Sequence, residues 1–218
     1  IESMQVQRGV GTSSNGGSAF GASINISTDN VQKDPYLTLD NSFGSFNSIK
    51  NTISLGTGLL ADKFTVDARL SKINSDGYID RASADLKSLF LSGAYHGKKS
   101  TLRFNLISGK EKTYQAWNGV PESRINGDEQ EMLDYAARNG LSSSEIENLL
   151  NAGRTYNSAE YHNETDNYQQ THYQLHYAYQ FNPKWNTKIA LHYTRGEGYY
   201  ENFRADDHFS TYGFNPIV

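Results

Sequence analysis

The chain has 218 residues, a formal net charge of −4 and no cysteine. The lack of cysteine excludes a disulfide framework, a thiolate nucleophile and a Cys-ligated metal, and the mild charge gives no sign of a nucleic-acid-binding surface. No apolar run reaches the ~18 residues that a transmembrane helix needs.

Residues 1–28 are expected to form a strand, a glycine-rich turn and a second strand. Val6 lies in the first strand, and Ile24 and Ile26 alternate with polar residues in the second. A phosphate-binding loop needs a helix after its glycines, but here a strand follows, so a tight β connection is favoured. The glycines available to this connection are Gly9, Gly11, Gly16, Gly17 and Gly21.

The segments IESMQVQRG and GGSAFGASINIST resemble the last part of the plug domain of TonB-dependent outer-membrane receptors. In that family a large β-barrel follows the plug and closes around it. The resemblance implies that residues 1–28 end a plug domain, that residues 29–35 form a linker and that residues 36–218 begin the barrel.

Apolar and polar residues alternate in most segments after Pro35, which predicts antiparallel strands with one apolar face. Folding each pair of segments about its turn brings apolar residues opposite one another. The expected pairs are Leu59 with Phe64, Leu55 with Ala68, Ile53 with Leu70, Tyr95 with Leu102, Phe104 with Gly93, Tyr177 with Ile189 and Leu175 with Leu191. The 15 Tyr, 10 Phe and 2 Trp suit the aromatic girdles of a transmembrane barrel, although tyrosine is also a good strand former.

Residues 109–166 interrupt the alternation, and a loop of that length is expected to carry structure of its own. One helix is predicted from Asp128 to the stop signal at Gly140, and a second begins at Ser142, which forms a capping box with Glu145. The two helices would form a hairpin. Their expected apolar stripes are Met132, Leu133, Ala136 and Ala137 in the first helix and Ile146, Leu149 and Leu150 in the second.

The turns alternate between tight and long, as in outer-membrane barrels with short periplasmic turns and longer extracellular loops. The segments DGYIDRA, SGAY and SGKEKTYQAWNGVPE also resemble the early barrel of these receptors, particularly iron-uptake members from the Bacteroidetes. Such a barrel has about 22 strands. We therefore expect an all-β fragment: about seven antiparallel strands of a transmembrane barrel after the last plug strands, with a short helical hairpin in one extracellular loop.

Aromatic residues in the expected extracellular loops are the candidates for ligand binding. Exposed aromatic side chains on long loops suit the capture of a chelate or another flat ligand. The alternative is that they pack the loops on one another. These residues are Tyr114, Trp117, Tyr156, Tyr161, Tyr199, Tyr200, Phe203 and Phe209.

Other candidates are placed by strand periodicity or by the resemblance. His172, Gln174 and His176 share a strand face that would line the lumen, either on the substrate path or as polar filling. Arg8 resembles the plug arginine that pairs with carboxylates on the inner barrel wall in this family. Asp40 and Asp67 are the carboxylates expected to face inward.

Histidines near carboxylates have the residue types of a metal site. His162 lies near Glu160 and Glu164, and His208 follows Asp206 and Asp207. Solvated charge is commoner in extracellular loops, so neither a metal nor another cofactor is expected. No catalytic constellation is apparent.

The sequence thus predicts a non-enzymatic part of an outer-membrane transporter for iron-siderophore, haem, cobalamin or glycan uptake. The partners that the resemblance implies are membrane lipid, the nutrient ligand and TonB. One alternative is a small stand-alone outer-membrane barrel or adhesin. Another is a soluble β-rich carbohydrate-binding domain, but apolar faces on its strands would make it aggregate.

Overall fold

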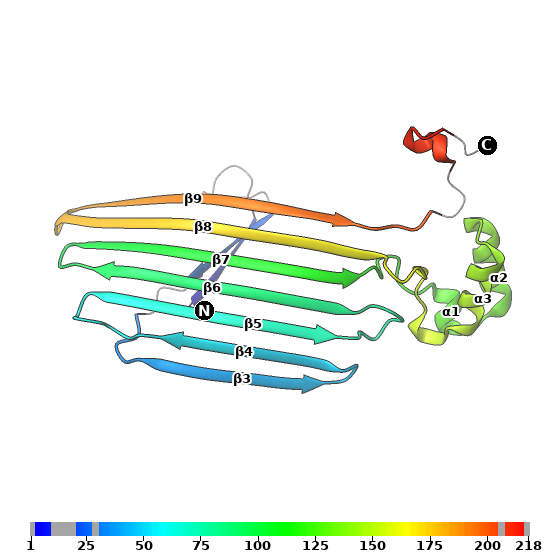
Figure 1. Cartoon of the computed structure of the whole chain (residues 1–218), viewed down its shortest axis with the longest axis horizontal. Helices are drawn as coiled ribbons and strands as arrows, with labels where there is room; N and C mark the ends of the chain where they lie inside the picture. The colour runs from blue at the N-terminus through cyan, green and yellow to red at the C-terminus, as the bar shows by residue number, and fades with distance from the viewer. Residues whose placement is uncertain (1–2, 10–20, 28–30, 205–207, 216–218) are drawn as a thin grey trace.

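The computed structural model describes residues 3–9, 21–27, 31–204 and 208–215. These residues form two antiparallel sheets, one of two strands and one of seven (Figure 1). The strands are β1 Ser3–Arg8, β2 Ala22–Ser27, β3 Tyr36–Gly44, β4 Ser48–Gly56, β5 Phe64–Ser75, β6 Ala84–His96, β7 Ser100–Tyr114, β8 Thr165–Asn182 and β9 Trp185–Tyr200. The helices are α1 Glu122–Asn126, α2 Glu129–Asn139 and α3 Ser143–Asn151, with 3₁₀ turns η1 Gly153–Thr155 and η2 Phe209–Tyr212. The expected antiparallel β class is confirmed.

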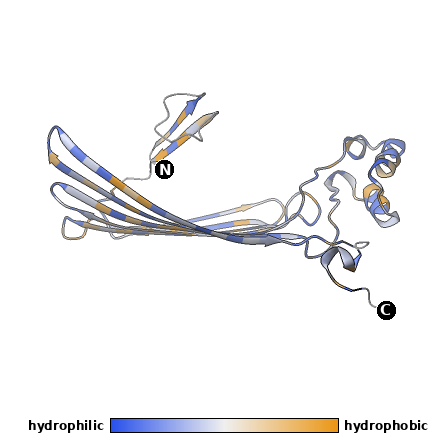
Figure 2. Cartoon of the chain, turned by 90° about the horizontal axis from the view of Figure 1, so that it is seen from above, coloured by the Kyte–Doolittle hydropathy of each residue, from blue (hydrophilic) through white to orange (hydrophobic). Residues whose placement is uncertain are grey.

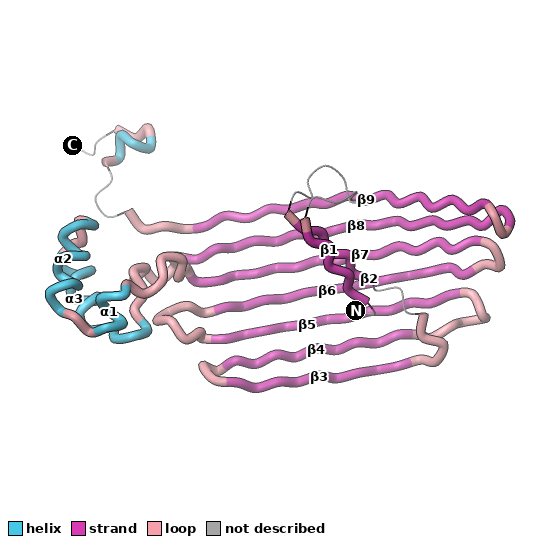
Figure 3. The backbone as a smooth tube through the Cα atoms, turned by 180° about the vertical axis from the view of Figure 1, so that it is seen from behind, coloured by secondary structure: helices cyan, strands magenta, loops and turns pink. Residues whose placement is uncertain are grey.

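Strands β1 and β2 pair antiparallel, which confirms the strand–turn–strand at the start of the chain. Val6 lies opposite Ile24. Gly9 has a φ of +79°, and its N–H donates to the Gly21 carbonyl at 2.8 Å, so this glycine closes the ladder where the turn begins. Gly11, Gly16 and Gly17 lie outside the described residues. The hairpin lies over one face of the seven-stranded sheet (Figures 1 and 3).

The seven-stranded sheet is a meander in which each strand from β3 to β9 pairs with the next in sequence. Successive strands run in opposite directions, so every second connection falls at the same end of the sheet. The helices and the chain after β9 lie at one end, opposite the tight turns that join β6 to β7 and β8 to β9 (Figure 1). The confirmed pairs are Ile53 with Leu70, Leu55 with Ala68, Tyr95 with Leu102, Gly93 with Phe104, Tyr177 with Ile189 and Leu175 with Leu191.

One expected pair is wrong, because Leu60 rather than Leu59 lies opposite Phe64. The chain leaves β4 before this point: Gly58 has a φ of +65°, and the Leu59 N–H donates to the Lys33 carbonyl at 2.9 Å. A contact with the preceding linker therefore shifts the pairing by one residue, which local alternation does not reveal.

The two faces of the sheet differ in chemistry. On the polar face, Ser92 Oγ donates to Asn105 Oδ1 at 2.8 Å, and Asn105 Nδ2 donates to Gln174 Oε1 at 3.3 Å. The hydroxyls of Thr52 and Ser71 lie 2.5 Å apart on the same face. The opposite face exposes large apolar side chains, among them Leu37, Leu39, Phe43, Phe64, Leu102, Phe104 and Leu191. A soluble protein rarely exposes so wide an apolar surface, so this face needs apolar surroundings.

Strands β7, β8 and β9 are longer than the sequence pattern indicates. β7 continues to Tyr114, β8 begins at Thr165 and β9 continues to Tyr200. The loop expected over residues 109–166 therefore spans only 115–164. The added residues are mostly polar on both faces, so the ladder continues where the apolar alternation that marks a strand has ended.

The insert contains both expected helices, with the expected caps. Asp128 accepts a hydrogen bond from the Glu131 N–H at 3.0 Å at the start of α2, and Gly140 ends that helix with a φ of 65°. Ser142 and Glu145 form the capping box that starts α3. Figure 2 shows the helices beyond the end of the sheet, at the same end as the C-terminal segment.

The core of the insert contains fewer residues of α2 than expected. Leu133 and Ala137 were expected to be buried but are exposed, because α2 contacts α3 through only one edge of its predicted stripe. The short α1 was not expected; its five residues after Pro121 are too few to show helical periodicity. The buried core residues are Met132, Ala136, Leu149 and Tyr156.

Candidate ligand-capture site

The ends of β7, β8 and β9 are joined beside the insert by two buried residues, Gln115 and Glu164. The Gln115 N–H donates to the Glu164 carbonyl at 2.9 Å, and Gln115 Nε2 donates to the Glu201 carbonyl at 2.8 Å. Glu164 Oε1 accepts from the Phe203 N–H at 3.3 Å. These bonds hold the chain that follows β9 against the other two strands and position the aromatic residues around it.

Two exposed aromatic pairs stand on this frame. The ring centroids of Trp117 and Tyr200 lie 5.9 Å apart at an interplanar angle of 65°. Tyr161 and Phe203 stack with centroids 5.1 Å apart and an angle of 18°. Trp117, Tyr200 and Phe203 are 64%, 64% and 58% exposed. We call these four residues the aromatic rim; exposed aromatic rings can stack on a flat ligand.

The other four aromatic candidates are placed differently. Tyr156 is in the core of the insert, and burial raises its pKa to about 12. Tyr114 is also buried, and its hydroxyl donates to the Tyr161 carbonyl at 2.5 Å. Tyr199 and Phe209 are exposed, but within the described part of the chain neither ring stacks on the rim. Tyr114 and Tyr156 thus pack within the loops, which was the alternative to ligand binding. Only the exposed candidates are accessible to a ligand.

A hydrogen-bonded latch fastens the insert to the loop between β5 and β6. Arg81 Nε donates to the Ala159 carbonyl at 2.9 Å, and Arg81 Nη2 donates to the Asn157 carbonyl at 3.0 Å. Asn157 Nδ2 donates to the carbonyls of Asp80 and Gln115, each at 2.9 Å. Sequence reasoning missed these residues, because their partners are main-chain carbonyls far away along the chain.

The residues expected to line the lumen do share the polar face of the sheet. His172 Nδ1 lies 2.9 Å from Thr194 Oγ1, and Gln174 accepts a hydrogen bond from Asn105. His176 is exposed on the same face. Neighbouring side chains therefore satisfy His172 and Gln174, as polar filling requires.

The residues expected to anchor the plug are not in contact with one another. Arg8 is exposed at the end of β1 and forms no ion pair among the described residues. Asp67 lies on the polar face and accepts from the Tyr36 hydroxyl at 3.0 Å, and Asp40 is on the same face. The pairing of Arg8 with a wall carboxylate remains a prediction.

The loop histidines that were candidates for a metal site are His162 and His208. Within the described ranges, no group of three or more His, Asp or Glu side chains could hold a metal ion. The His162 ring packs on Tyr161, with centroids 4.4 Å apart. Asp206 and Asp207, the carboxylates next to His208, lie outside the described residues.

None of the described helices is long and apolar enough to span a membrane.

A comparison with protein-family models gives no match, and a comparison with curated protein sequences gives none either. Solved structures do match. The closed form of the ferric-catecholate import receptor Fiu from E. coli K12 has a TM-score of 0.69 and 17% identity over 88% of this chain. The chain has the fold of a segment of an import receptor.

The open form of Fiu also has a TM-score of 0.69, with 16% identity over 89% of this chain. The chain spans 26% and 28% of the length of these two structures. The likeness confirms, at the level of the fold, the resemblance to TonB-dependent receptors that the sequence indicated. These neighbours are import receptors rather than enzymes. The narrower resemblance to Bacteroidetes members remains a prediction.

Proposed function

We propose that this chain is part of a TonB-dependent receptor of the bacterial outer membrane and that the receptor imports an iron chelate. One observation carries the proposal. A sheet with the fold of an import-receptor segment exposes an apolar face and places an aromatic rim at the end where its longest connection lies.

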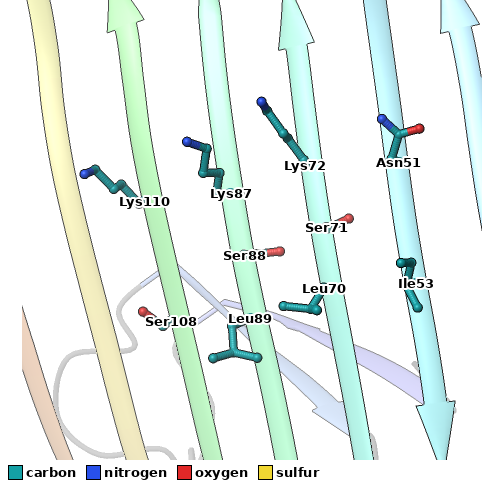
Figure 4. A pocket seen from close by; sticks show the side chains of 10 residues that line it. All are labelled: Asn51, Ile53, Leu70, Ser71, Lys72, Lys87, Ser88, Leu89, Ser108 and Lys110. Carbon is teal, nitrogen blue, oxygen red and sulfur yellow. The ribbon is translucent and has the colours of Figure 1, made fainter.

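The two faces of the sheet support the membrane assignment. The apolar face would meet lipid, and the polar face would line the lumen, as in transmembrane barrels. In Figure 4, β1 and β2 run behind the sheet, on the side away from the apolar residues Ile53, Leu70 and Leu89. The hairpin is therefore on the lumen side, where the end of a plug domain (residues 1–28) belongs. Residues 29–35 would be the linker to the barrel.

The aromatic rim supports ligand capture. It lies where the extracellular loop that was expected over residues 109–166, and that spans 115–164 in the structure, leaves the sheet, so it would be accessible from outside the cell. Fiu is named for a ferric catecholate, and flat aromatic chelating groups suit the open faces of Trp117 and Phe203. Haem, cobalamin and glycans are the competing substrates. No chemistry is performed; energy reaching the plug through TonB would release the captured ligand inward.

The test uses a deletion strain that expresses the full-length receptor. Binding and uptake of a radiolabelled ferric catecholate, haem, cobalamin and a glycan are measured on whole cells. We expect Trp117→Ala with Phe203→Ala to weaken binding of the ferric catecholate about 10-fold, because two ring contacts are lost. Membrane fractionation checks that the receptor reaches the outer membrane.

A matched control is Phe46→Ala with Tyr78→Ala. These residues form an exposed edge-to-face pair, with centroids 5.5 Å apart, on the loops after β3 and β5. The control should bind normally. A strain that takes up ferric catecholates without the receptor but fails on one of the other nutrients would overturn the substrate, and equal loss in both double variants would overturn the rim.

A further inference from the structure

The linker between the hairpin and the sheet crosses the β4–β5 turn in direct contact with it. Residues 31–35 are the described part of this linker, and they meet the sheet at the end where the tight turns lie (Figure 1). The Leu59 N–H donates to the Lys33 carbonyl at 2.9 Å. A Cβ at Gly58 would lie 2.5 Å from the Lys33 carbonyl oxygen and 2.7 Å from the Pro35 nitrogen. Only glycine therefore leaves room for the linker at this position.

Hydrogen bonds on both sides of Gly58 fix the turn that receives the linker. The Thr57 N–H donates to the Val66 carbonyl at 2.9 Å, and Thr57 Oγ1 accepts from the Val66 N–H at 3.0 Å. The Thr57 hydroxyl also donates to the Gly58 carbonyl at 2.9 Å. Leu60 pairs with Phe64 across the turn. The turn cannot move aside without breaking these bonds, so the place where the linker lies is built into the sheet.

A second contact follows where the linker becomes β3. Tyr36, Gly56 and Asp67 lie opposite one another in β3, β4 and β5. The Tyr36 ring lies where a Cβ at Gly56 would overlap it, and the Tyr36 hydroxyl donates to Asp67 Oδ1 at 3.0 Å. The first residue of β3 is thus tied to β5, a strand that is not its neighbour in the sheet.

We propose that Gly56 and Gly58 form a clamp that holds the linker on the sheet and stops a movement of the plug from spreading into the barrel. This inference rests on the proposed function, in which energy reaching the plug releases the ligand inward. The chain before Lys33 moves with the plug, whereas the clamp keeps β3 paired with β4. The linker clamp consists of Lys33, Tyr36, Gly56, Gly58 and Asp67.

The position of β3 explains why a clamp is needed. β3 is an outer strand of the seven-stranded sheet, and its first residue, Tyr36, follows the linker directly. A displaced linker would act first on this end of the β3–β4 ladder, where the ladder bonds can break one after another. Glycine weakens a strand because it has no side chain to pack, so Gly56 is costly unless its empty side is used. Here the Tyr36 ring fills that side.

The test is limited digestion of the purified full-length receptor in mild detergent with trypsin. Cleavage after Lys33 requires the linker to leave the turn, so its rate reports how often the clamp opens. Gly58→Ala places a Cβ against the linker and strains a φ of +65°, and should make this cleavage at least about 10-fold faster. Tyr36→Phe removes only the hydrogen bond to Asp67 and should make it about 3-fold faster.

Two other glycine variants separate the clamp from general effects of alanine. Gly93→Ala adds a methyl group in open space within β6, and Gly127→Ala strains a φ of +75° with no atom nearby. Both should be cleaved after Lys33 at the wild-type rate. Cleavage after Lys99, between β6 and β7, is the internal control and should be the same in every variant. Heat-modifiable migration on a gel checks that each receptor is folded.

A second measurement tests the role in transport. In the deletion strain, the Gly58→Ala receptor should bind the ferric catecholate normally, because the aromatic rim lies at the opposite end of the sheet. Its initial uptake rate should fall several-fold, because a movement of the plug is lost in a loose linker. A merely structural role would lower binding and uptake together, by reducing the amount of folded receptor.

A wild-type rate of cleavage after Lys33 in Gly58→Ala would overturn the clamp, and so would equal acceleration after Lys99. If Gly58→Ala does not fold, unchanged cleavage of Tyr36→Phe would overturn it instead. Normal uptake despite faster cleavage, or an equal fall in binding and uptake, would overturn the role in transport. The digestion involves no nutrient, so a protected linker in a receptor that imports no ferric catecholate would overturn the proposed function alone.

Discussion

The helical insert and the seven-stranded sheet arrange apolar residues in opposite ways. In the insert, Leu149 is 0% exposed and charged side chains face out. In the sheet, Leu191 is 61% exposed, whereas Asn105 is 8% exposed. The difference teaches that the two regions need different surroundings: the insert buries its apolar side chains in a core of its own, whereas the sheet displays them on one face, as the proposed place in a membrane requires.

Leu149→Ala is expected to have the largest effect, and it tests whether the insert has a core that is independent of the sheet. Truncating a leucine that is fully buried in the core of the insert should destabilise the insert by about 2–5 kcal/mol. Hydrogen exchange of the full-length receptor should show faster exchange in α2 and α3 and unchanged exchange in β5 and β6. Leu39→Ala, on the apolar face of the sheet, is the control and should leave the insert unchanged. Loss of protection across the whole sheet would show that the two regions fold as one.

A second substitution tests the face assignment in the sheet. Leu175→Arg would put a charge on the apolar face near mid-bilayer and should cost about 2–4 kcal/mol of folding free energy in lipid. Gln174→Arg changes the adjacent residue on the polar face and should be far milder. Urea unfolding of the receptor in vesicles measures both. Equal destabilisation by the two substitutions would contradict the lipid-facing assignment of the apolar face.

The smallest effect is expected at the latch that joins the two regions. Asn157→Ala removes the donors to the Asp80 and Gln115 carbonyls and should weaken the attachment of the insert by about 1–3 kcal/mol. Limited proteolysis between β7 and β8 should become faster while the sheet stays folded. Asn118→Ala, which loses only an exposed hydrogen bond to Ser158, is the control and should cleave at the wild-type rate. Equal cleavage of both variants would show that the latch does not hold the insert.

Most strand registers could be predicted because each strand has one apolar face and side chains alternate with a period of two residues, which leaves few possible pairings. A shift of one residue would turn every apolar side chain of β8 to the polar face, so Leu175 must lie opposite Leu191 once the turn is placed. The helix caps were equally predictable, because Ser142 and Glu145 are three residues apart and act locally.

The candidate site was predicted only in part. The sequence identified loop aromatic residues as a class, but exposure separates Trp117 from Tyr156, and burial depends on how α2, α3 and the following turn pack. The extension of β7 to Tyr114 was missed, because a strand that is polar on both faces shows no alternation.

The sequence by itself determined the β class, the two faces of the sheet and the capped helices, since these follow from periodicities of two and 3.6 residues and from contacts within a single turn. The tertiary structure decided what depends on distant neighbours. Leu60 replaced Leu59 in its pair through a contact with Lys33, and the latch joined Arg81 to Asn157. Lys72, Lys87 and Lys110 lie side by side only because three strands in register bring these separated residues together, and short-range sequence patterns do not show such contacts.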